Sequence, residues 1–186
     1  FVEEQIDKAP KQFGVSGRDG KFPLPFPHPQ NLFYTRTCTG GQSWIEPETK
    51  AFKRVTLADL RYWGRLADRL EHIDFYASIV PDDVPRLTAD VHTIRTALEN
   101  VEKMIWVQPY TLETVEYLVQ LGVVAAGGEE NLRKHPQLNF ITCALSPFMV
   151  KDMDVEIILQ CARRGIPMMP CSLPGSGATG PVTTPA

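Results

Sequence analysis

The sequence has no long apolar run and no surplus of positive charge. Its longest apolar stretches, such as residues 121–126, are far shorter than the roughly 20 residues that a membrane-spanning helix needs. Lysine and arginine number 19 against 22 aspartates and glutamates, a formal net charge of −3, which disfavours broad nucleic-acid binding. The first residues lack the regions of a signal peptide and no initiator methionine is present. We therefore expect a segment of a longer cytoplasmic protein, with neither membrane nor nucleic acid as a partner.

Cysteine is also scarce, and the sequence has no C-x-x-C motif. A zinc site needs closely spaced pairs of ligands, and the histidines are too far apart to supply the missing ones. We expect no bound metal, and instead small buried thiols in a reducing compartment. The residues concerned are Cys38, Cys143, Cys161 and Cys171, together with His28, His72, His92 and His135.

Proline is abundant, with 16 residues among 186, and it is concentrated near the N-terminus. Four prolines alternate with other residues over positions 23–29, which favours an extended backbone. The prediction is an extended segment laid over the domain and anchored by Phe22, Leu24 and Phe26, with polyproline recognition as the alternative. A turn at residues 39–42 and the alternation over residues 43–50 predict a short hairpin.

From Thr56 onwards, short apolar runs alternate with segments of helical spacing. The apolar runs predict strands at residues 75–80, 104–108, 140–145 and 167–172. Repeated strand–helix units imply a parallel sheet covered by helices, closed either as an open doubly wound sheet or as a (β/α)8 barrel.

The helical segments carry recognisable ends. Thr56 followed by Asp59 predicts a capping box, and Gly165 after Arg163 and Arg164 predicts a C-terminal cap. The other predicted helix starts are Asp83, Thr111 and Asp154, with a short helical turn over residues 129–134. The predicted core-facing residues are, helix by helix, Leu57, Leu60, Trp63, Leu66 and Leu70; Leu87, Val91, Ile94, Leu98 and Val101; Val115, Leu118 and Val119; and Val155, Ile158, Leu159 and Ala162.

A complete barrel takes about 250 residues, and only four units fit in this chain. The predicted fold class is therefore α/β, a partial (β/α)8 TIM barrel of about four βα units with an N-terminal extension. Residues 1–55 form the extension, and residues 56–186 form the first half of the barrel, truncated. Four units leave an open sheet edge and a half-exposed core face, so we expect this piece alone to be marginally stable.

The sharpest local motif is the G-x-G-x-x-G string at residues 175–180. Such a string can cradle a pyrophosphate at a helix start, which predicts a nucleotide-dependent oxidoreductase. Here it follows the fourth strand rather than the first, Pro174 precedes it, Pro181 follows it, and no Lys-Ser or Lys-Thr comes after it. A glycine-rich loop at the carboxyl end of a barrel strand is the favoured interpretation.

Several strings along the chain together resemble one family. They are APKQF at 9–13 with GRD at 17–19, TLADL at 56–60 with DDVP at 82–85, AGGEENLR at 126–133, CALSPF at 143–148 and GSGATGPVT at 175–183. In this order they resemble the trimethylamine methyltransferase family, corrinoid-dependent enzymes that act on methylated and quaternary amines. Two departures are mild, Phe148 where the family has Leu and Ser176 where it has Ala.

The resemblance implies a (β/α)8 barrel that transfers a methyl group from a methylated, most plausibly quaternary, amine such as trimethylamine or glycine betaine. The acceptor is the cobalt of a separate corrinoid protein, so the corrinoid is carried by a partner and none is bound by this segment. A piece that only binds a partner is a second alternative, and self-association is left open. The pyrrolysine position of the trimethylamine enzymes would lie beyond Ala186, so its presence is also left open.

Barrel enzymes place their sites at the carboxyl ends of the strands. The polar residues there that we expect to face one cavity are Asp82, Gln108, Ser146, Ser172 and Thr179. Aromatic faces attract a quaternary ammonium group, and the aromatic residues near these ends are Tyr76, Trp106, Tyr110 and Phe148. Gly175, Gly177 and Gly180 would let the flat corrinoid of the partner approach the backbone closely. No catalytic residue is assigned.

Overall fold

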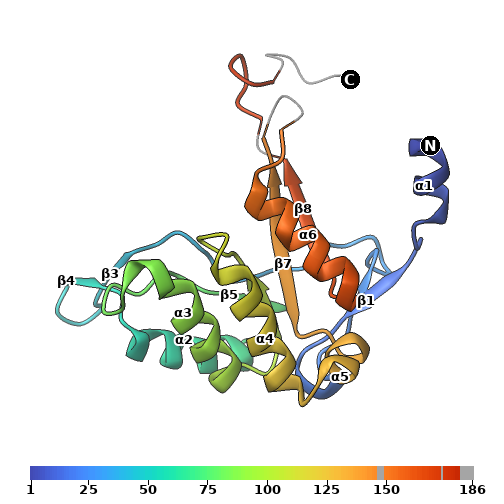
Figure 1. Cartoon of the computed structure of the whole chain (residues 1–186). Coiled ribbons are helices and arrows are strands. Elements are labelled where there is room, and N and C mark those ends of the chain that lie inside the picture. Colours follow the sequence, from blue (N-terminus) through green and yellow to red (C-terminus); the bar gives the residue numbers. More distant parts are fainter. Residues whose placement is uncertain (146–148, 173, 181–186) are drawn as a thin grey trace.

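The structure is a computed structural model of the chain, and it describes residues 1–145, 149–172 and 174–180. Its centre is a parallel sheet with the strand order β5–β6–β7–β8, which is also the order along the chain (Figure 1). The strands are β5 (Phe75–Ala77), β6 (Met104–Val107), β7 (Leu138–Ala144) and β8 (Met168–Ser172). The predicted parallel sheet of consecutive βα units is confirmed.

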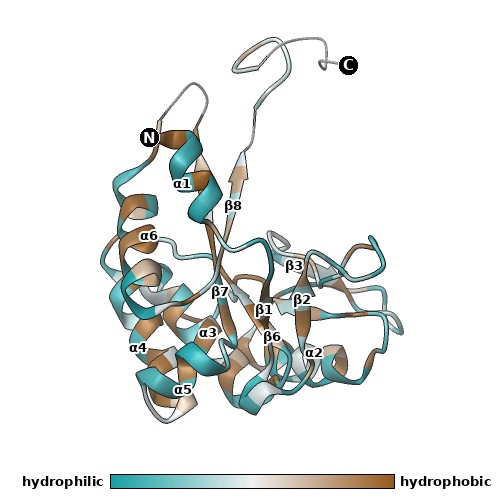
Figure 2. Cartoon of the chain, turned by 90° about the vertical axis from the view of Figure 1, so that its right-hand side faces the viewer, coloured by the Kyte–Doolittle hydropathy of each residue, from teal (hydrophilic) through white to brown (hydrophobic). Residues whose placement is uncertain are grey.

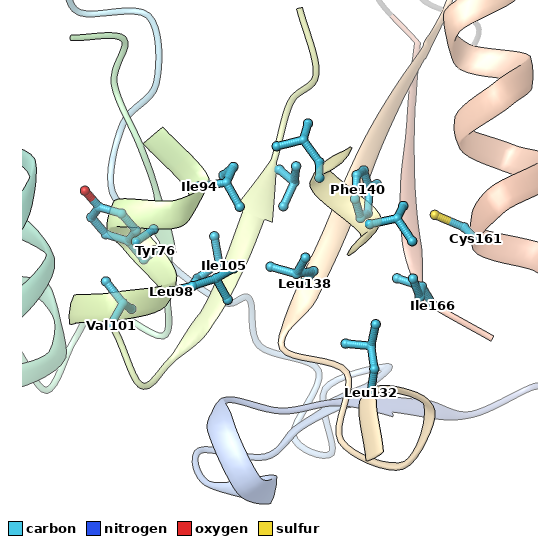
Figure 3. Close-up of a cluster of buried hydrophobic side chains, with 14 of the residues drawn as sticks. Tyr76, Ile94, Leu98, Val101, Ile105, Leu132, Leu138, Phe140, Cys161 and Ile166 are labelled. Atoms are coloured by element: carbon cyan, nitrogen blue, oxygen red, sulfur yellow. The ribbon is translucent and has the colours of Figure 1, made fainter. Parts of the chain in front are cut away.

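Helices cover one face of this sheet. They are α2 (Leu57–Arg69), α3 (Ala89–Asn100), α4 (Thr114–Ala126), α5 (Glu129–Lys134) and α6 (Asp152–Arg164), with a 3-10 turn η2 (Arg86–Thr88) before α3. Between helices and sheet lies the larger apolar core, in which Ile105, Leu138 and Phe140 of the strands meet Leu98 of α3 and Cys161 of α6 (Figure 3). Within the described ranges, no helix is long and apolar enough to cross a bilayer.

The opposite face, which we call the inner face, is covered by the first of two antiparallel hairpins in the N-terminal part of the chain. The elements of that part are α1 (Val2–Lys8), the 3-10 turn η1 (Arg18–Gly20) and the hairpins β1–β2 (Phe13–Val15 and Leu24–Phe26) and β3–β4 (Ser43–Ile45 and Phe52–Arg54). Helix α1 buries no residue. Val15 and Leu24 of the first hairpin pack with Phe75, Met104 and Trp106, which alternate with the helix-facing residues of β5 and β6. The sheet is thus buried on two faces near the amino ends of its strands.

Two of the three predicted anchors in the proline-rich segment are confirmed. Leu24 is buried and Phe26 is half-buried and stacks on Phe13, with ring centroids 5.3 Å apart. Phe22, however, is 40% exposed, its backbone has a left-handed φ of +49°, and its ring lies under the Lys103 ammonium, 5.7 Å from the ring centroid. The predicted hairpin after residue 42 is also confirmed, although its second strand begins at Phe52, and Trp44 packs edge-on against Trp63 of α2.

A short extended segment, Thr35–Thr37, runs along the outer edge of β5, and we call it the strap. Its Arg36 pairs with Phe75 in the parallel sense. The backbone nitrogen of Phe75 donates to the Thr35 carbonyl at 3.2 Å, and the Thr37 hydroxyl accepts from the Ala77 nitrogen at 2.8 Å. Thr37 also donates to the Ala77 carbonyl at 2.6 Å. The strap therefore satisfies the edge groups that β5 would otherwise leave unpaired.

The helix ends agree with the sequence-based predictions more closely than the buried helix faces do. The capping box of Thr56 and Asp59 is present, and Gly165 ends α6 in the left-handed conformation. The helix predicted from Asp83 begins at Ala89, however, because η2 precedes it, and Leu87 is 75% exposed. The helix predicted from Thr111 begins at Thr114, whose hydroxyl donates back to the Thr111 carbonyl at 3.0 Å.

The terminal helices of the series bury a narrower face than predicted. On α2 the buried residues are Leu60, Gly64 and Ala67, while Leu66 and Leu70 are exposed. On α6 Ile157 and Cys161 are buried, whereas the predicted Val155 and Leu159 face solvent. Both helices therefore carry apolar residues on the flank as well as on the core face, and the sequence pattern alone does not distinguish the two.

Candidate functional site

A small cavity of about 80 Å³ opens at the carboxyl ends of β5 and β6. It combines residues that follow the two strands with residues of α3 and of the loop after the strap. Its floor includes Trp106, the inner-face residue of β6. The lining residues are Thr39, Gly40, Ser78, Val80, Asp90, Thr93, Ile94, Trp106, Gln108 and Tyr110.

One aromatic face near this cavity already holds a cation. The guanidinium carbon of Arg36 lies 4.6 Å from the centre of the Trp106 ring, within the range of a cation–π contact. Arg36 reaches it from the strap, and its own nitrogen donates to the Thr37 carbonyl at 3.1 Å. The indole nitrogen of Trp106 has no hydrogen-bond partner among the described residues. The inner face thus provides a buried aromatic surface suited to a positively charged group.

Buried Asp90 fixes the position of the neighbouring loop. One of its carboxylate oxygens accepts from the Tyr110 backbone nitrogen at 2.9 Å and from the Thr114 hydroxyl at 2.5 Å. Burial raises the pKa of Tyr110 to about 12, and the negative charge of Asp90 acts in the same direction. Tyr110 therefore remains a neutral phenol that can donate a hydrogen bond at physiological pH.

The structure brings together only some of the residues predicted to share one mouth. Gln108 and Tyr110 line the cavity, whereas Asp82, Ser172 and Thr179 are not among its lining residues. Asp82 is exposed, and its nitrogen donates to the Val55 carbonyl at 2.7 Å. Ser172 is exposed at the end of β8.

Four further predicted residues either lie away from this cavity or fall outside the described part of the chain. The predicted residues Ser146 and Phe148 lie outside the described residues. Tyr76 belongs to the core under the helices, so its ring is on the face opposite Trp106, because side chains alternate along a strand. Asp83 caps a helix, but the helix is α2, whose Leu57 nitrogen donates to its carboxylate at 3.0 Å.

In the glycine-rich loop, most backbone N–H groups donate hydrogen bonds to acceptors within the loop itself. The nitrogens of Ala178, Thr179 and Gly180 all donate to the Gly175 carbonyl at 2.9–3.0 Å. The nitrogen of Gly175 donates to the Thr179 hydroxyl at 2.8 Å, and that of Gly177 donates to the Gly180 carbonyl at 3.0 Å. A pyrophosphate cradle needs these donors free and a helix start behind them. Up to residue 180 the loop is a closed turn rather than such a cradle.

Sequence reasoning missed two residues at this site. Arg36 follows the proline-rich segment without any motif around it, so nothing in the sequence places it over a strand 70 positions away. Asp90 lies within the helix predicted from Asp83 and is not one of the residues predicted to face its core. A signal was available only for Asp90, because a carboxylate in the first turn of a helix is a common partner of neighbouring backbone nitrogens.

A bound metal ion would need several suitable side chains close together among the described residues. No three histidine, cysteine, aspartate or glutamate side chains within residues 1–145, 149–172 and 174–180 come together in a way that could hold a metal ion. The site as described can bind a cation against an aromatic face and offer hydrogen bonds from Gln108 and Tyr110. It contains no nucleophile paired with a base.

Comparisons with known proteins point to one family. The family described as trimethylamine methyltransferase (MTTB) matches residues 1–186. The chain is 27% identical over 184 residues to the trimethylamine methyltransferase MttB of Desulfitobacterium hafniense. It is 29% identical over 186 residues to the protein of the same name from Methanosarcina barkeri. It is also 20% identical over 185 residues to a glycine betaine methyltransferase of Desulfitobacterium hafniense.

The coverage of these matches is unequal. Each alignment takes in 98% of this chain but only 37–38% of the relative. The chain therefore spans little more than a third of the length of the curated proteins that it matches.

Proposed function

Since the chain belongs to the trimethylamine methyltransferase family, we propose that the full-length protein removes a methyl group from a methylated amine. The acceptor in this proposal is the cobalt(I) of a separate corrinoid protein. The observation that carries the proposal is the match over the whole described chain, in a protein whose inner face presents an aromatic surface to a cation. Both trimethylamine and glycine betaine methyltransferases are among the relatives. The proposal therefore names the class of substrate, a methylated amine, and not one individual amine.

We further propose that the parallel sheet is the first part of a (β/α)8 barrel. The support is geometric, because four consecutive strands are parallel and adjacent in chain order with helices on one face. The two end helices, α2 and α6, each leave apolar side chains exposed, among them Leu66 and Val155. Further βα units would cover these flanks, as neighbouring helices do in a complete barrel.

The inner face near Trp106 is the proposed amine site. A quaternary ammonium group carries no proton to donate, so its recognition depends on aromatic faces and nearby negative charge. Trp106 supplies such a face, and Gln108 and Tyr110 supply polar contacts at the same cavity. Arg36 now occupies the indole face, so an amine bound there would displace it or bind through an anionic substituent to the guanidinium.

The glycine-rich loop is the proposed contact for the partner's corrinoid. The corrinoid would supply a cobalt ion that accepts the methyl group, and the chain itself would supply only an approach surface. Gly175 is exposed, and a side chain there would meet nothing closer than the Thr179 hydroxyl oxygen at 3.6 Å. The small residues of this loop fit the close approach of a flat macrocycle.

The alternatives make different predictions. A nucleotide-dependent oxidoreductase would need free amides in the loop, and its internal hydrogen bonds disfavour that function. A protein that only binds a partner would bind the corrinoid protein without any transfer.

The test uses the full-length protein mixed with a corrinoid protein in the cobalt(I) state. Addition of trimethylamine or glycine betaine is expected to produce the absorption change of methyl-cobalt. The matched control is 3,3-dimethylbutanoate, the all-carbon analogue of glycine betaine, which has no N-methyl group and should give no change. Absence of a spectral change with every methylated amine tried would reject the proposed function.

A further inference from the structure

Two cysteines lie side by side on the parallel strands β7 and β8. Cys143 and Cys171 are directly opposite each other in the register of the two strands. The thiol groups are within hydrogen-bonding reach of each other. Neighbouring strands are about 4.8 Å apart, and disulfides in proteins span Cα separations of about 4.4–6.8 Å. The backbone therefore already holds the two residues at a separation that a disulfide can bridge.

Both thiols are on the inner face and near the carboxyl ends of the strands. Ile141 and Met169 pack against the inner-face cluster, and side chains two residues further along a strand point to the same side. Cys143 and Cys171 are those residues, and both are partly exposed. The pair is therefore partly accessible from the inner face, on the side of the sheet opposite the helices that cover the larger core.

We propose that Cys143 and Cys171 form a reversible dithiol–disulfide site that reacts with low-molecular-weight disulfides. This inference does not depend on the proposed methyl transfer. The other two cysteines lack the arrangement. Cys161 is buried under α6, and Cys38 is exposed on the loop after the strap, with its sulfur donating to the Thr39 carbonyl at 3.0 Å.

The reaction proceeds in two thiol–disulfide exchanges. The thiolate of Cys171 attacks one sulfur of glutathione disulfide, the S–S bond of glutathione disulfide breaks, and one glutathione leaves. Cys143 then attacks the sulfur of Cys171 in the mixed disulfide, and the second glutathione leaves. The two cysteine protons end on the two glutathione thiols, so the cysteine pair is oxidised while glutathione disulfide is reduced.

Cys143 is assigned the second step in this scheme because its thiol is held in the protonated form by its surroundings. Burial raises the pKa of Cys143, and the adjacent Cys171 and Asp154 raise it further, while Lys151 opposes them. The Cys143 backbone nitrogen donates to Asp154 at 3.0 Å, which fixes the carboxylate beside this residue. Cys143 is thus suited to the second, resolving step, in which the partner sulfur is already in place.

The experiment treats the native full-length protein with glutathione disulfide, blocks the remaining thiols and digests the product with trypsin without reduction. Cleavage after Lys134, Lys151 and Arg164 separates Cys143, Cys161 and Cys171 onto different peptides. Mass spectrometry is expected to find the peptide of residues 135–151 linked to the peptide that begins at Gly165. Two thiols should be lost per chain and recovered with dithiothreitol.

Variants separate the proposal from random oxidation. Cys171→Ser should abolish the linked species, while Cys38→Ser, the matched control at an exposed cysteine, should leave it unchanged. Circular dichroism of the variants verifies the fold, and the wild-type digest remains decisive if a variant misfolds. Linkage of Cys143 to Cys38, or glutathione adducts without a cysteine–cysteine bond, would overturn the proposal.

Discussion

At the scale of single residues, Gly17 shows how tightly the N-terminal segment sits on the sheet. Its nitrogen donates to the Lys21 carbonyl, and the next residue, Arg18, donates from its backbone to the Glu102 carbonyl at 2.7 Å. A side chain on Gly17 would place its Cβ 2.1 Å from that same Glu102 oxygen. The φ of Gly17 is −77°, which any residue adopts, so contact with backbone alone excludes a side chain.

We predict that Gly17→Ala lowers the free energy of unfolding by about 1–3 kcal/mol, the usual cost of overpacking. Gly14→Ala is the matched control, because its Cβ would meet only the Leu24 carbonyl oxygen at 3.9 Å. That variant should remain within about 0.5 kcal/mol of the wild type. Denaturant unfolding of both variants measures the difference, and equal stabilities would contradict the packing described here.

Arg36 provides a second residue-scale prediction, which rests on the proposed amine site. The guanidinium stacks on Trp106, so it competes with a purely cationic amine for the indole face and attracts a carboxylate. Arg36→Met keeps much of the side-chain length and removes the charge. The ratio of glycine betaine affinity to trimethylamine affinity should fall, by about 5- to 30-fold for a contact of about 1–2 kcal/mol.

Calorimetric titration of both amines against the full-length protein measures this ratio. Arg36→Lys, which retains the charge, should change the ratio less than Arg36→Met does. An unchanged ratio in Arg36→Met would show that the guanidinium does not face the bound amine.

At the scale of elements, the sequence predicted the strands and most caps because their signals are local. Each strand is a short apolar run, and the cap of α2 depends on two residues three positions apart. The buried face of α6 could not be predicted in the same way. Ile157 and Cys161 compete with Val155 and Leu159 for the core, and the choice depends on the neighbouring sheet and helices. The strap was missed for the same reason, since its partner β5 is distant in sequence.

The glycine-rich loop is the element whose substitution tests the proposed corrinoid contact. Gly177 has a φ of +74°, so Gly177→Val would strain the backbone as well as add bulk. Gly175 is the cleaner position, since no atom lies within 3.4 Å of the place a Cβ would take. We predict that Gly175→Val leaves the fold and amine binding intact and lowers the rate of methyl transfer at least tenfold, a barrier increase of about 1.4 kcal/mol.

Gly175→Ala is the control for this prediction and should have a smaller effect in proportion to its smaller side chain. Stopped-flow absorbance follows the methyl-cobalt product, and titration calorimetry follows the amine. Full transfer rates in Gly175→Val would remove the loop from the proposed contact surface.

At the scale of the whole molecule, the sequence predicted part of the lining of the candidate cavity. Gln108 and Tyr110 follow the carboxyl end of β6, where barrel enzymes place their sites, and both line this cavity, while their role in binding stays a prediction. The same rule could not locate Arg36, because that residue enters from outside the strand–helix series. The rule also placed Asp82 at the mouth, whereas the chain after β5 turns towards Val55 and leaves Asp82 exposed.

Alkaline stability is a property of the whole fold that follows from a buried thiol and a partly buried phenol. Burial raises the pKa of Cys161 to about 12, and the thiol lies in the core beside Phe140 and Ile166 (Figure 3). In the unfolded chain the thiol loses its proton near pH 8.5. Between these values the unfolded state binds fewer protons than the folded state, so stability falls as pH rises. Tyr110 acts in the same direction, and Lys103, whose pKa is lowered by burial, acts in the opposite one.

We predict that the free energy of unfolding decreases between pH 9 and pH 12. The slope should be less steep in Cys161→Ala by up to about 1.4 kcal/mol per pH unit. Denaturant midpoints collected across this range measure how the free energy of unfolding changes with pH. The cavity that the substitution leaves lowers stability equally at every pH, so it does not alter this slope. Parallel slopes for the two proteins would mean that the thiol is not protected in the folded state.

The position of the strap early in the sequence has a consequence for the order in which strand edges are paired during synthesis. In Figure 2 β8, the end strand of the sheet, extends upwards beyond β6, and within the described residues no strand pairs with its outer edge. Thr37 precedes its partner Ala77 by 40 residues, a delay of roughly 2–8 s at the usual rate of synthesis. On the ribosome, the strap is therefore already synthesised when β5 emerges, and it can pair with the outer edge of β5 at once. Until the last strand of the proposed barrel is made, the strap can cover this edge of the nascent sheet, so a neighbouring nascent chain finds few unpaired backbone groups there.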